Sequence, residues 1–223
     1  MKSLLKIMLI LFCFFASTFI AIKISGLLSI DDIKTWLTVA GELNGYLVAL
    51  IVVGLLFLDL FIAVPTLTLI IFGGYFLGPY AGGISAMIGL LLAGVTGYVI
   101  SYKYGNMLFD KLVKDPTERP NAIALFQQRG PVVILLSRAS PILPEISACM
   151  AGMTKMPFKQ FIGCWITSTV PYACIAAYAG SISTLENPKP AIYTAIGLTG
   201  FFWACWWIFN KQVSRTKAEG SHS

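Results

Sequence analysis

The chain has 223 residues, of which 57% are hydrophobic and only 12% are charged, and its mean hydropathy is +0.79. This composition excludes a soluble globular domain, which needs far more charge to cover its surface. The net charge of +6 is spread over the N-terminus, one central segment and the C-terminal tail, and it forms no basic stripe of the kind that binds nucleic acid. We therefore expect an all-α integral membrane protein that does not bind nucleic acid.

The apolar segments lack the residues for zinc or serine–histidine chemistry. The five cysteines form no CxxC pair, and the only histidine, His222, lies in the tail. Zinc sites need clustered thiolates, imidazoles or carboxylates, and a Ser/His mechanism needs a histidine within the membrane. We predict that the protein is not an enzyme and uses no cofactor.

Residues 4–28 form the first apolar segment and follow Lys2 and Lys6. The length of this segment favours an uncleaved transmembrane helix within residues 1–29, while a cleaved signal peptide is the alternative. The two lysines place the N-terminus in the cytoplasm by the positive-inside rule. Residues 29–44 then have the pattern of a short amphipathic helix on the outer membrane surface.

The main membrane domain is predicted over residues 30–210, followed by a cytoplasmic tail at residues 211–223. Three of its apolar segments are long enough to span a bilayer as helices. These lie at residues 80–102, 158–180 and 190–210.

Two other apolar segments are interrupted by charge and proline, and they resemble each other. The first, DLFIAVPTLTLIIFGGYFLGPYAGG, begins at Asp59, and the second, RASPILPEISACMAGMTKMPFKQF, begins at Arg138. Each charged residue lies six positions before a proline, Pro65 in the first segment and Pro144 in the second. Duplicated apolar segments that are broken by proline are typical of transporters built from internal repeats.

A second anchor supports the duplication. When Gly74 is aligned with Gly152, a further proline follows five positions later in both segments, although the register between the two anchors slips by one residue. We predict repeats at residues 45–102 and 130–180. The second repeat is expected to begin where Gly130, directly before a proline, ends a short preceding helix.

The distribution of charge predicts how the interrupted segments sit in the membrane. The polar segment at residues 103–129 carries more lysine and arginine than acidic residues, which places it in the cytoplasm. This placement requires residues 45–78 to enter from the outside and return to the same side, and residues 131–152 to do the same from the cytoplasm. The expected fold is an inverted repeat with two facing re-entrant helical hairpins plus about four transmembrane helices, and with both termini in the cytoplasm.

Charged residues at membrane depth mark candidate functional sites. Facing hairpins would bring Asp59 and Arg138 to one shared cavity, where they could form an ion pair at rest. An anionic substrate would then bind Arg138 while Asp59 or Glu145 takes up a proton. The alternatives are a static buried ion pair, an Arg138 side chain that extends to the interface, and a hydrated cap formed by Glu145.

Prolines and glycines complete the candidate transport site. The prolines are expected to break their helices and free backbone groups for ligand contact, whereas the glycines have tight turning or close packing as their alternative role. These residues are Pro65, Pro141, Pro144, Gly73, Gly74 and Gly152.

Small residues recur every four positions in the predicted helix at residues 80–102. Such a stripe lets another helix approach closely, although it also matches the ordinary composition of a membrane helix. The stripe consists of Ser85, Gly89, Ala93, Gly97 and Ser101.

Two stretches, VPTLTLIIFGGYFLGPYAGG (64–83) and LSRASPILPEISACMAGMTKMPF (136–158), resemble the DedA-like family, also called the SNARE-associated Golgi protein or VTT-domain family. The resemblance covers roughly residues 30–210 and implies two facing re-entrant hairpins. It also implies lipid movement across a bilayer. Eukaryotic relatives scramble phospholipids, and bacterial relatives recycle the polyprenyl-phosphate carrier, in many cases with dependence on the proton motive force.

The chain departs from the bacterial DedA branch at two places. That branch has a second arginine six residues after the first, whereas this chain has Pro144 there, followed by Glu145. Its first hairpin often carries a glutamate near the prolines, whereas the polar residues here are Thr66, Thr68 and the more distant Asp59. The chain is therefore most similar to the branch typified by the yeast Golgi protein.

These observations predict a transporter or scramblase of the bacterial plasma membrane that moves an anionic lipid, either a phospholipid or a polyprenyl phosphate. Arg138 would bind the phosphate through charge-assisted hydrogen bonds, and a proton would be the coupling ion. The predicted partners are membrane lipids with anionic headgroups, and a homo-oligomer is also consistent with the sequence. The alternatives are a transporter of a small ion or solute, and an assembly factor that transports nothing.

Overall fold

The computed structural model describes residues 44–112 except residue 63, residues 118–184 except residue 141, residues 187–219, and scattered positions before residue 44. These residues are helical or lie in turns between helices, so the predicted all-α class is confirmed for them. Apart from the scattered positions, the predicted transmembrane helix at residues 1–29 and the surface helix at residues 29–44 lie outside the described residues.

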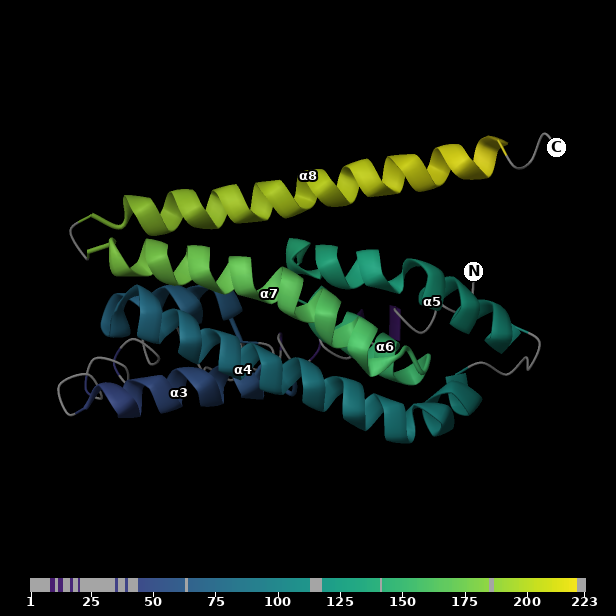
Figure 1. Cartoon of the computed structure of the whole chain (residues 1–223), viewed down its shortest axis with the longest axis horizontal. Helices are drawn as coiled ribbons and strands as arrows, with labels where there is room; N and C mark the ends of the chain where they lie inside the picture. Colours follow the sequence, from purple (N-terminus) through teal and green to yellow (C-terminus); the bar gives the residue numbers. More distant parts are fainter. Residues whose placement is uncertain are drawn as a thin grey trace.

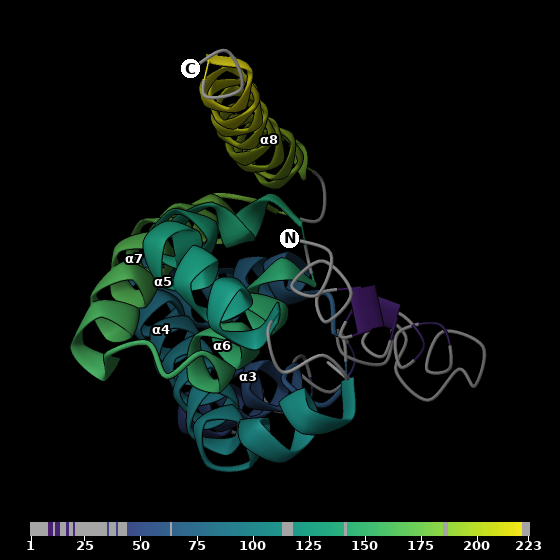
Figure 2. The same cartoon turned by 90° about the vertical axis from the view of Figure 1, so that its right-hand side faces the viewer.

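The described helices pack side by side as an elongated bundle, with α8 along one side of it (Figures 1 and 2). The helices are α3 (Gly45–Leu58), α4 (Thr66–Leu112), α5 (Glu118–Leu136), the short 3-10 helix η1 (Ser137–Ala139), α6 (Leu143–Met153), α7 (Phe158–Ser181) and α8 (Lys189–Glu219).

Helix α4 consists of two legs that meet at Gly78. The backbone of Gly78 has φ 79° and ψ 175°, a conformation that only glycine adopts readily, and Pro79 begins the next leg. The chain folds back at this point, so that residues on the two sides of Gly78 lie close together. A Cβ atom on Gly82 would lie only 2.6 Å from the carbonyl oxygen of Gly73. The interrupted first segment therefore consists of α3, a break, and a short leg at residues 66–77.

The second interrupted segment has the same order of elements. Helix α5 leads into the break at η1, and the short helix α6 then leads into the long helix α7. The predicted end of a helix at Gly130 is wrong, because α5 begins at Glu118 and passes through Pro131. Proline disfavours the helical conformation of the preceding residue through a clash with that residue's Cβ atom. Gly130 has no Cβ atom, so the helix can continue.

Helices α4 and α7 pack against each other in opposite directions. Early in its second leg, α4 places Gly83 near Ala177, while Gly94 lies under the indole ring of Trp165 further along. The indole Nε1 of Trp165 donates a hydrogen bond to the carbonyl of Leu90 at 3.1 Å. Residue numbers thus rise along α4 as they fall along α7.

The predicted stripe of small residues on α4 is a packing surface, as expected. A Cβ atom on Gly89 would lie 2.7 Å from the Cβ of Leu56 in α3, and one on Gly97 would lie 2.9 Å from Leu60. Helix α6 also packs closely on α4. A Cβ atom on Gly152 of α6 would lie 2.3 Å from the carbonyl oxygen of Tyr98 in α4. Close backbone contact of this kind is the usual means of helix association in membranes.

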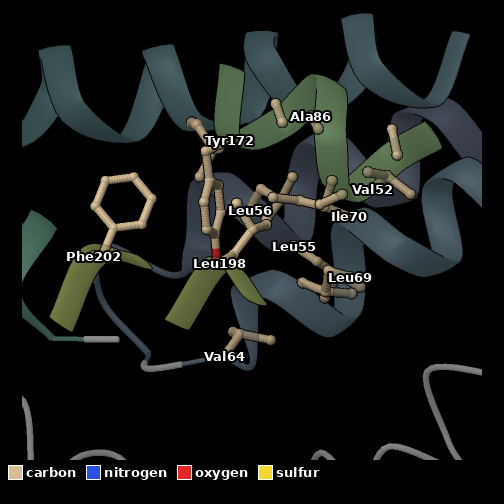
Figure 3. Packing of buried hydrophobic residues seen from close by; sticks show 14 of the residues in the cluster. Val52, Leu55, Leu56, Val64, Leu69, Ile70, Ala86, Tyr172, Leu198 and Phe202 are labelled. Atoms are coloured by element: carbon tan, nitrogen blue, oxygen red, sulfur yellow. The ribbon is translucent and has the colours of Figure 1, made fainter. Parts of the chain in front are cut away.

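Two groups of buried apolar side chains hold the bundle together. One joins α3, both legs of α4, α7 and α8, and Figure 3 shows Tyr172 between the side chains of α3 and α4 and the ring of Phe202. The rings of Tyr172 and Phe202 are 6.2 Å apart. The other group joins α4, α5, α6 and α7 around Tyr98, Phe161 and Trp165. Each interrupted segment therefore contributes to a buried apolar group that also contains side chains of α4 and α7.

Two helical stretches, Thr66–Gly105 and Phe158–Ser181, are long and apolar enough to cross a membrane, and Gly45–Leu58 is a shorter apolar helix. Many large apolar side chains also point outward, including Phe201, Trp203 and Trp207 on α8, which are each about 60% exposed. This all-helical architecture with an apolar surface fits a membrane protein.

Candidate functional site

The interrupted segments bring both predicted charged residues into the protein interior. Asp59 directly follows α3 and is 3% exposed, while Arg138 lies in η1 and is 8% exposed. Pro65 directly precedes α4, and Pro144 lies in the first turn of α6. The backbone N–H groups in the first turn of a helix have no partner within the helix, so proline is tolerated there. These two prolines therefore mark the start of the short helical leg that follows each break, which is residues 66–77 in the first segment and α6 in the second. Pro141 lies outside the described residues.

Asp59 uses both carboxylate oxygens within its own segment. Its Oδ1 accepts a hydrogen bond from the backbone N–H of Val64 at 2.7 Å, and its Oδ2 accepts one from the hydroxyl of Thr66 at 2.6 Å. The carboxylate thus ties the break after α3 to the start of α4. Among the described residues, it forms no ion pair with Arg138 in this conformation.

We expect Asp59→Ala to lower the free energy of unfolding by about 2–5 kcal/mol, because it leaves the buried Val64 N–H unpaired and leaves the Thr66 hydroxyl only its longer bond to the Val64 carbonyl, at 3.4 Å. Asp59→Asn should retain most of the stability, since an amide can accept from Val64 and donate to Thr66. Denaturant titration of the purified protein in detergent measures both values. An alanine variant as stable as wild type would show that the hydrogen bonds of Asp59 to Val64 and Thr66 do not stabilise the fold.

Arg138 is held by residues of α7. Its Nη2 donates a hydrogen bond to the hydroxyl of Thr169 at 2.9 Å, and its guanidinium carbon lies 5.2 Å and 5.4 Å from the ring centroids of Trp165 and Tyr172. Its Nε is buried and has no hydrogen-bond partner among the described residues. A buried cation with an unused donor can bind an anion.

A small cavity joins the three predicted charged residues. Asp59, Arg138 and Glu145 line a space of about 10 Å³, together with Trp165 and small residues of α4 and α6. This volume admits at most about one water molecule. The Oε2 atom of Glu145 is buried and has no hydrogen-bond partner among the described residues, so it can hold a proton or bind such a water.

A larger cavity of about 260 Å³ lies on the other side of Arg138. Arg138 is the residue that lines both cavities. Hydroxyl groups line this cavity together with Arg138, and they come from the two interrupted segments, from α7 and from α8. The polar lining consists of Thr66, Thr68, Arg138, Ser140, Tyr172 and Thr199, and Pro65 and Pro144 also lie in the wall.

The predicted glycines contribute to packing and do not line either cavity. A Cβ atom on Gly74 would lie 2.0 Å from the carbonyl oxygen of Ala177, and one on Gly73 would lie 3.4 Å from Val52. Gly152 meets the backbone of α4 in the same way. Their alternative role in close packing is therefore the one that the structure supports.

Sequence reasoning missed the residues of α7 that contact Arg138 and the residue of α8 that lines the larger cavity with it. Thr169, Tyr172 and Thr199 are polar residues within apolar helices, and that was a usable signal. Sequence alone could not show which of the many hydroxyl residues face Arg138. In the described part of the chain, no group of three or more His, Cys, Asp or Glu side chains is placed to hold a metal ion.

Comparison with known proteins places this arrangement in a family. The family model of the VTT domain matches residues 64–182, which is more than half of the chain. The chain belongs to the VTT-domain family. The matched part of this VTT-domain protein begins at the short leg of the first segment and ends with α7, so it contains Arg138 and Glu145 but not Asp59.

A curated relative of this VTT-domain protein is undecaprenyl phosphate transporter A of Bacillus subtilis (strain 168). The two chains are 28% identical over 163 residues, which cover 68% of this chain and 76% of the relative. That relative is named as a transporter and not as an enzyme. No solved structure gives a significant match.

Proposed function

We propose that this VTT-domain protein is a transporter or scramblase of the bacterial plasma membrane that moves a phosphate-bearing anionic lipid. The observation that carries the proposal is the buried Arg138, which has an unused donor and lies on the wall of a hydroxyl-lined cavity of about 260 Å³. Membership of the VTT-domain family and the relative named as an undecaprenyl phosphate transporter support a lipid-related role.

The chemistry of the larger cavity suits a phosphate group. A guanidinium presents several N–H donors in a planar fork that matches phosphate oxygens, and the hydroxyls of Thr66, Thr68 and Ser140 can donate further hydrogen bonds. The volume suits a headgroup and excludes a long hydrocarbon chain. In our proposal the headgroup enters the cavity while the lipid tails stay in the bilayer.

The proposed architecture is an inverted repeat with two re-entrant hairpins that meet at Arg138. Three features support it: the matching order of elements, the antiparallel long helices, and an exchange of contacts between repeats. Gly74 of the first repeat packs on α7, and Gly152 of the second packs on α4. A two-fold axis in the membrane plane would produce this exchange.

The proposed orientation follows from basic residues at one end of the bundle. The end of α4, the starts of α5 and α7, and the C-terminal part of α8 lie at the same end of the bundle (Figure 1). Lys103, Lys155, Lys159 and Lys211 belong to or lie beside these parts of the chain. We assign this end to the cytoplasm by the positive-inside rule, which places the C-terminus there.

Proton coupling would use the small cavity. Because Glu145 Oε2 has no hydrogen-bond partner among the described residues, Glu145→Gln should fold normally while removing a proton site. We expect transport by this variant to lose its response to an imposed proton gradient, and Glu186→Gln serves as a control outside the described residues. A gradient response equal to that of wild type would exclude Glu145 as the coupling group.

The test of the proposed function is lipid movement in proteoliposomes. The purified protein is reconstituted with labelled phospholipid or labelled polyprenyl phosphate, with and without a proton gradient, and the appearance of the label in the opposite leaflet is followed. Movement of one lipid above the rate in empty vesicles supports the proposal. If neither lipid moves under either condition, the proposal is wrong.

A second candidate is transport of a small inorganic oxyanion. It is favoured by the size of the larger cavity, which would hold such an ion without any lipid tail outside it. Uptake of labelled phosphate or sulfate into the same vesicles distinguishes the two. Uptake without lipid movement would replace the first proposal by the second.

A further inference from the structure

A groove of about 300 Å³ lies at the proposed cytoplasmic end of the bundle, away from Arg138. We call it the interfacial groove. It is formed where the apolar stretch of α4, which ends at Gly105, meets the start of α7 at Phe158. Its lining consists of Tyr98, Val99, Tyr102, Lys155, Met156, Pro157 and Phe158.

The groove lies at the level where the headgroups of membrane lipids are expected. Two stretches long enough to cross a membrane, Thr66–Gly105 and Phe158–Ser181, both have an end here. Tyrosine and lysine concentrate at this level in membrane proteins, because one part of each side chain is apolar and the other is wet. Tyr102 and Phe158 are each about 45% exposed, so they are accessible to lipid.

The walls of the interfacial groove are largely aromatic. Tyr98 stacks on Tyr102 and on Phe161, with ring centroids 5.7 Å and 4.7 Å apart, and its hydroxyl donates a hydrogen bond to the carbonyl of Met156. Phe158 lies 5.5 Å from the ring of Tyr98. Such walls can hold the glycerol region and the first acyl carbons of a lipid.

Lys155 is the charged residue of this lining. Its Nζ lies 3.7 Å from the ring centroid of Tyr102 and donates a hydrogen bond to the carbonyl of that residue. These contacts hold the ammonium group at the groove. Two further lysines, Lys103 and Lys159, lie next to lining residues in the sequence and are exposed, so the surroundings attract anions.

The backbone of Lys155 is unusual for a lysine. Helix α6 ends in a Schellman motif, in which the N–H of Met156 donates to the carbonyl of Ala151 and the N–H of Lys155 donates to that of Gly152. Lys155 therefore has φ 57°, in the left-handed region where glycine is the usual residue. A lysine at this position makes the protein less stable than a glycine would. Backbone strain of this kind is found where a side chain has a function, such as binding a ligand.

We propose that the interfacial groove binds the headgroup of an anionic phospholipid from the adjacent leaflet. Lys155 contacts the phosphate, and Tyr102 and Phe158 contact the glycerol region. The site is separate from the cavity at Arg138, and its occupation does not depend on the proposed transport function.

The test compares binding of phosphatidylglycerol and phosphatidylcholine to the full chain in detergent by native mass spectrometry. Lys155→Gly is the informative variant, because it removes the side chain while placing the residue that the backbone prefers. We expect it to fold at least as well as wild type and to bind phosphatidylglycerol about fivefold more weakly. Lys159→Ala, an exposed lysine outside the lining, controls for general charge.

Four outcomes would overturn the proposal. They are an unchanged affinity of Lys155→Gly, an equal loss in Lys159→Ala, equal binding of the two lipids by wild type, and complete displacement of lipid by millimolar inorganic phosphate. Arg138→Ala provides the link to the transport site. Phosphatidylglycerol binding that persists in this variant and falls in Lys155→Gly assigns the lipid to the interfacial groove, whatever the transport assays show.

Discussion

Replacing Arg138 with alanine is expected to lower lipid transport in proteoliposomes by about a hundredfold or more. The variant loses the charged donor of the larger cavity, and each hydrogen bond to a charged group contributes about 1.5–3 kcal/mol. It also leaves Asp59 and Glu145 without the cation that shares their cavity. Arg138→Lys keeps the charge but lacks the planar fork that lies between Trp165 and Tyr172. We expect it to retain about a tenth of the activity.

The experiment depends on a matched control and on evidence of folding. Arg129→Ala removes another arginine near the same segment, outside the lining of both cavities, and should transport normally. Each variant is compared with wild type by size-exclusion chromatography and thermal unfolding before reconstitution. A folded Arg138→Ala protein with wild-type transport would show that the cavity is not the transport site.

Adding a single methyl group at Gly74 should disrupt the fold. In Gly74→Ala the new Cβ atom would lie 2.0 Å from the carbonyl oxygen of Ala177 and 2.8 Å from its Cα atom. Both are backbone atoms, so α7 as a whole must move away from the short leg of α4. We expect a loss of about 3 kcal/mol or more in the free energy of unfolding, seen as a low yield of folded protein and a lower denaturation midpoint.

Gly163→Ala is the control for this prediction. Gly163 lies in the exposed part of α7, and a Cβ atom there would meet no described atom within 4 Å. Because alanine favours the helix more than glycine does, this variant should match or exceed wild-type stability by up to about 1 kcal/mol. Equal stability of Gly74→Ala and wild type would mean that the contact between the short leg of α4 and α7 is looser than the structure indicates.

Proline and glycine made most helix boundaries predictable. Pro65, Pro79, Pro144 and Pro157 each lie at or beside the start of a helix, because proline needs no N–H partner there. Pro131 and Pro171 instead lie inside helices, and the glycine before Pro131 allows α5 to continue. The predicted stripe of small residues on α4 was also identified correctly, because close helix packing requires small side chains wherever it occurs.

The candidate site was only partly accessible to sequence reasoning. Burial of a charged group in an apolar segment is expensive, so the sequence by itself determined that Asp59, Arg138 and Glu145 required an explanation. The partners depend on contacts between residues far apart in the chain. Only the tertiary structure showed that Asp59 binds its own segment, whereas Arg138 binds Thr169 of α7.

The amino-acid sequence determined the helical class, the two interrupted segments and the charged residues within them, because each depends on local properties: hydropathy, the missing N–H of proline and the missing side chain of glycine. The tertiary structure decided which hydroxyls line the larger cavity with Arg138, how Gly74 and Gly152 pack against α7 and α4, and that a lysine with left-handed backbone lies in an aromatic groove. These features arise from the antiparallel packing of α4 and α7, which brings together residues that are distant in the sequence.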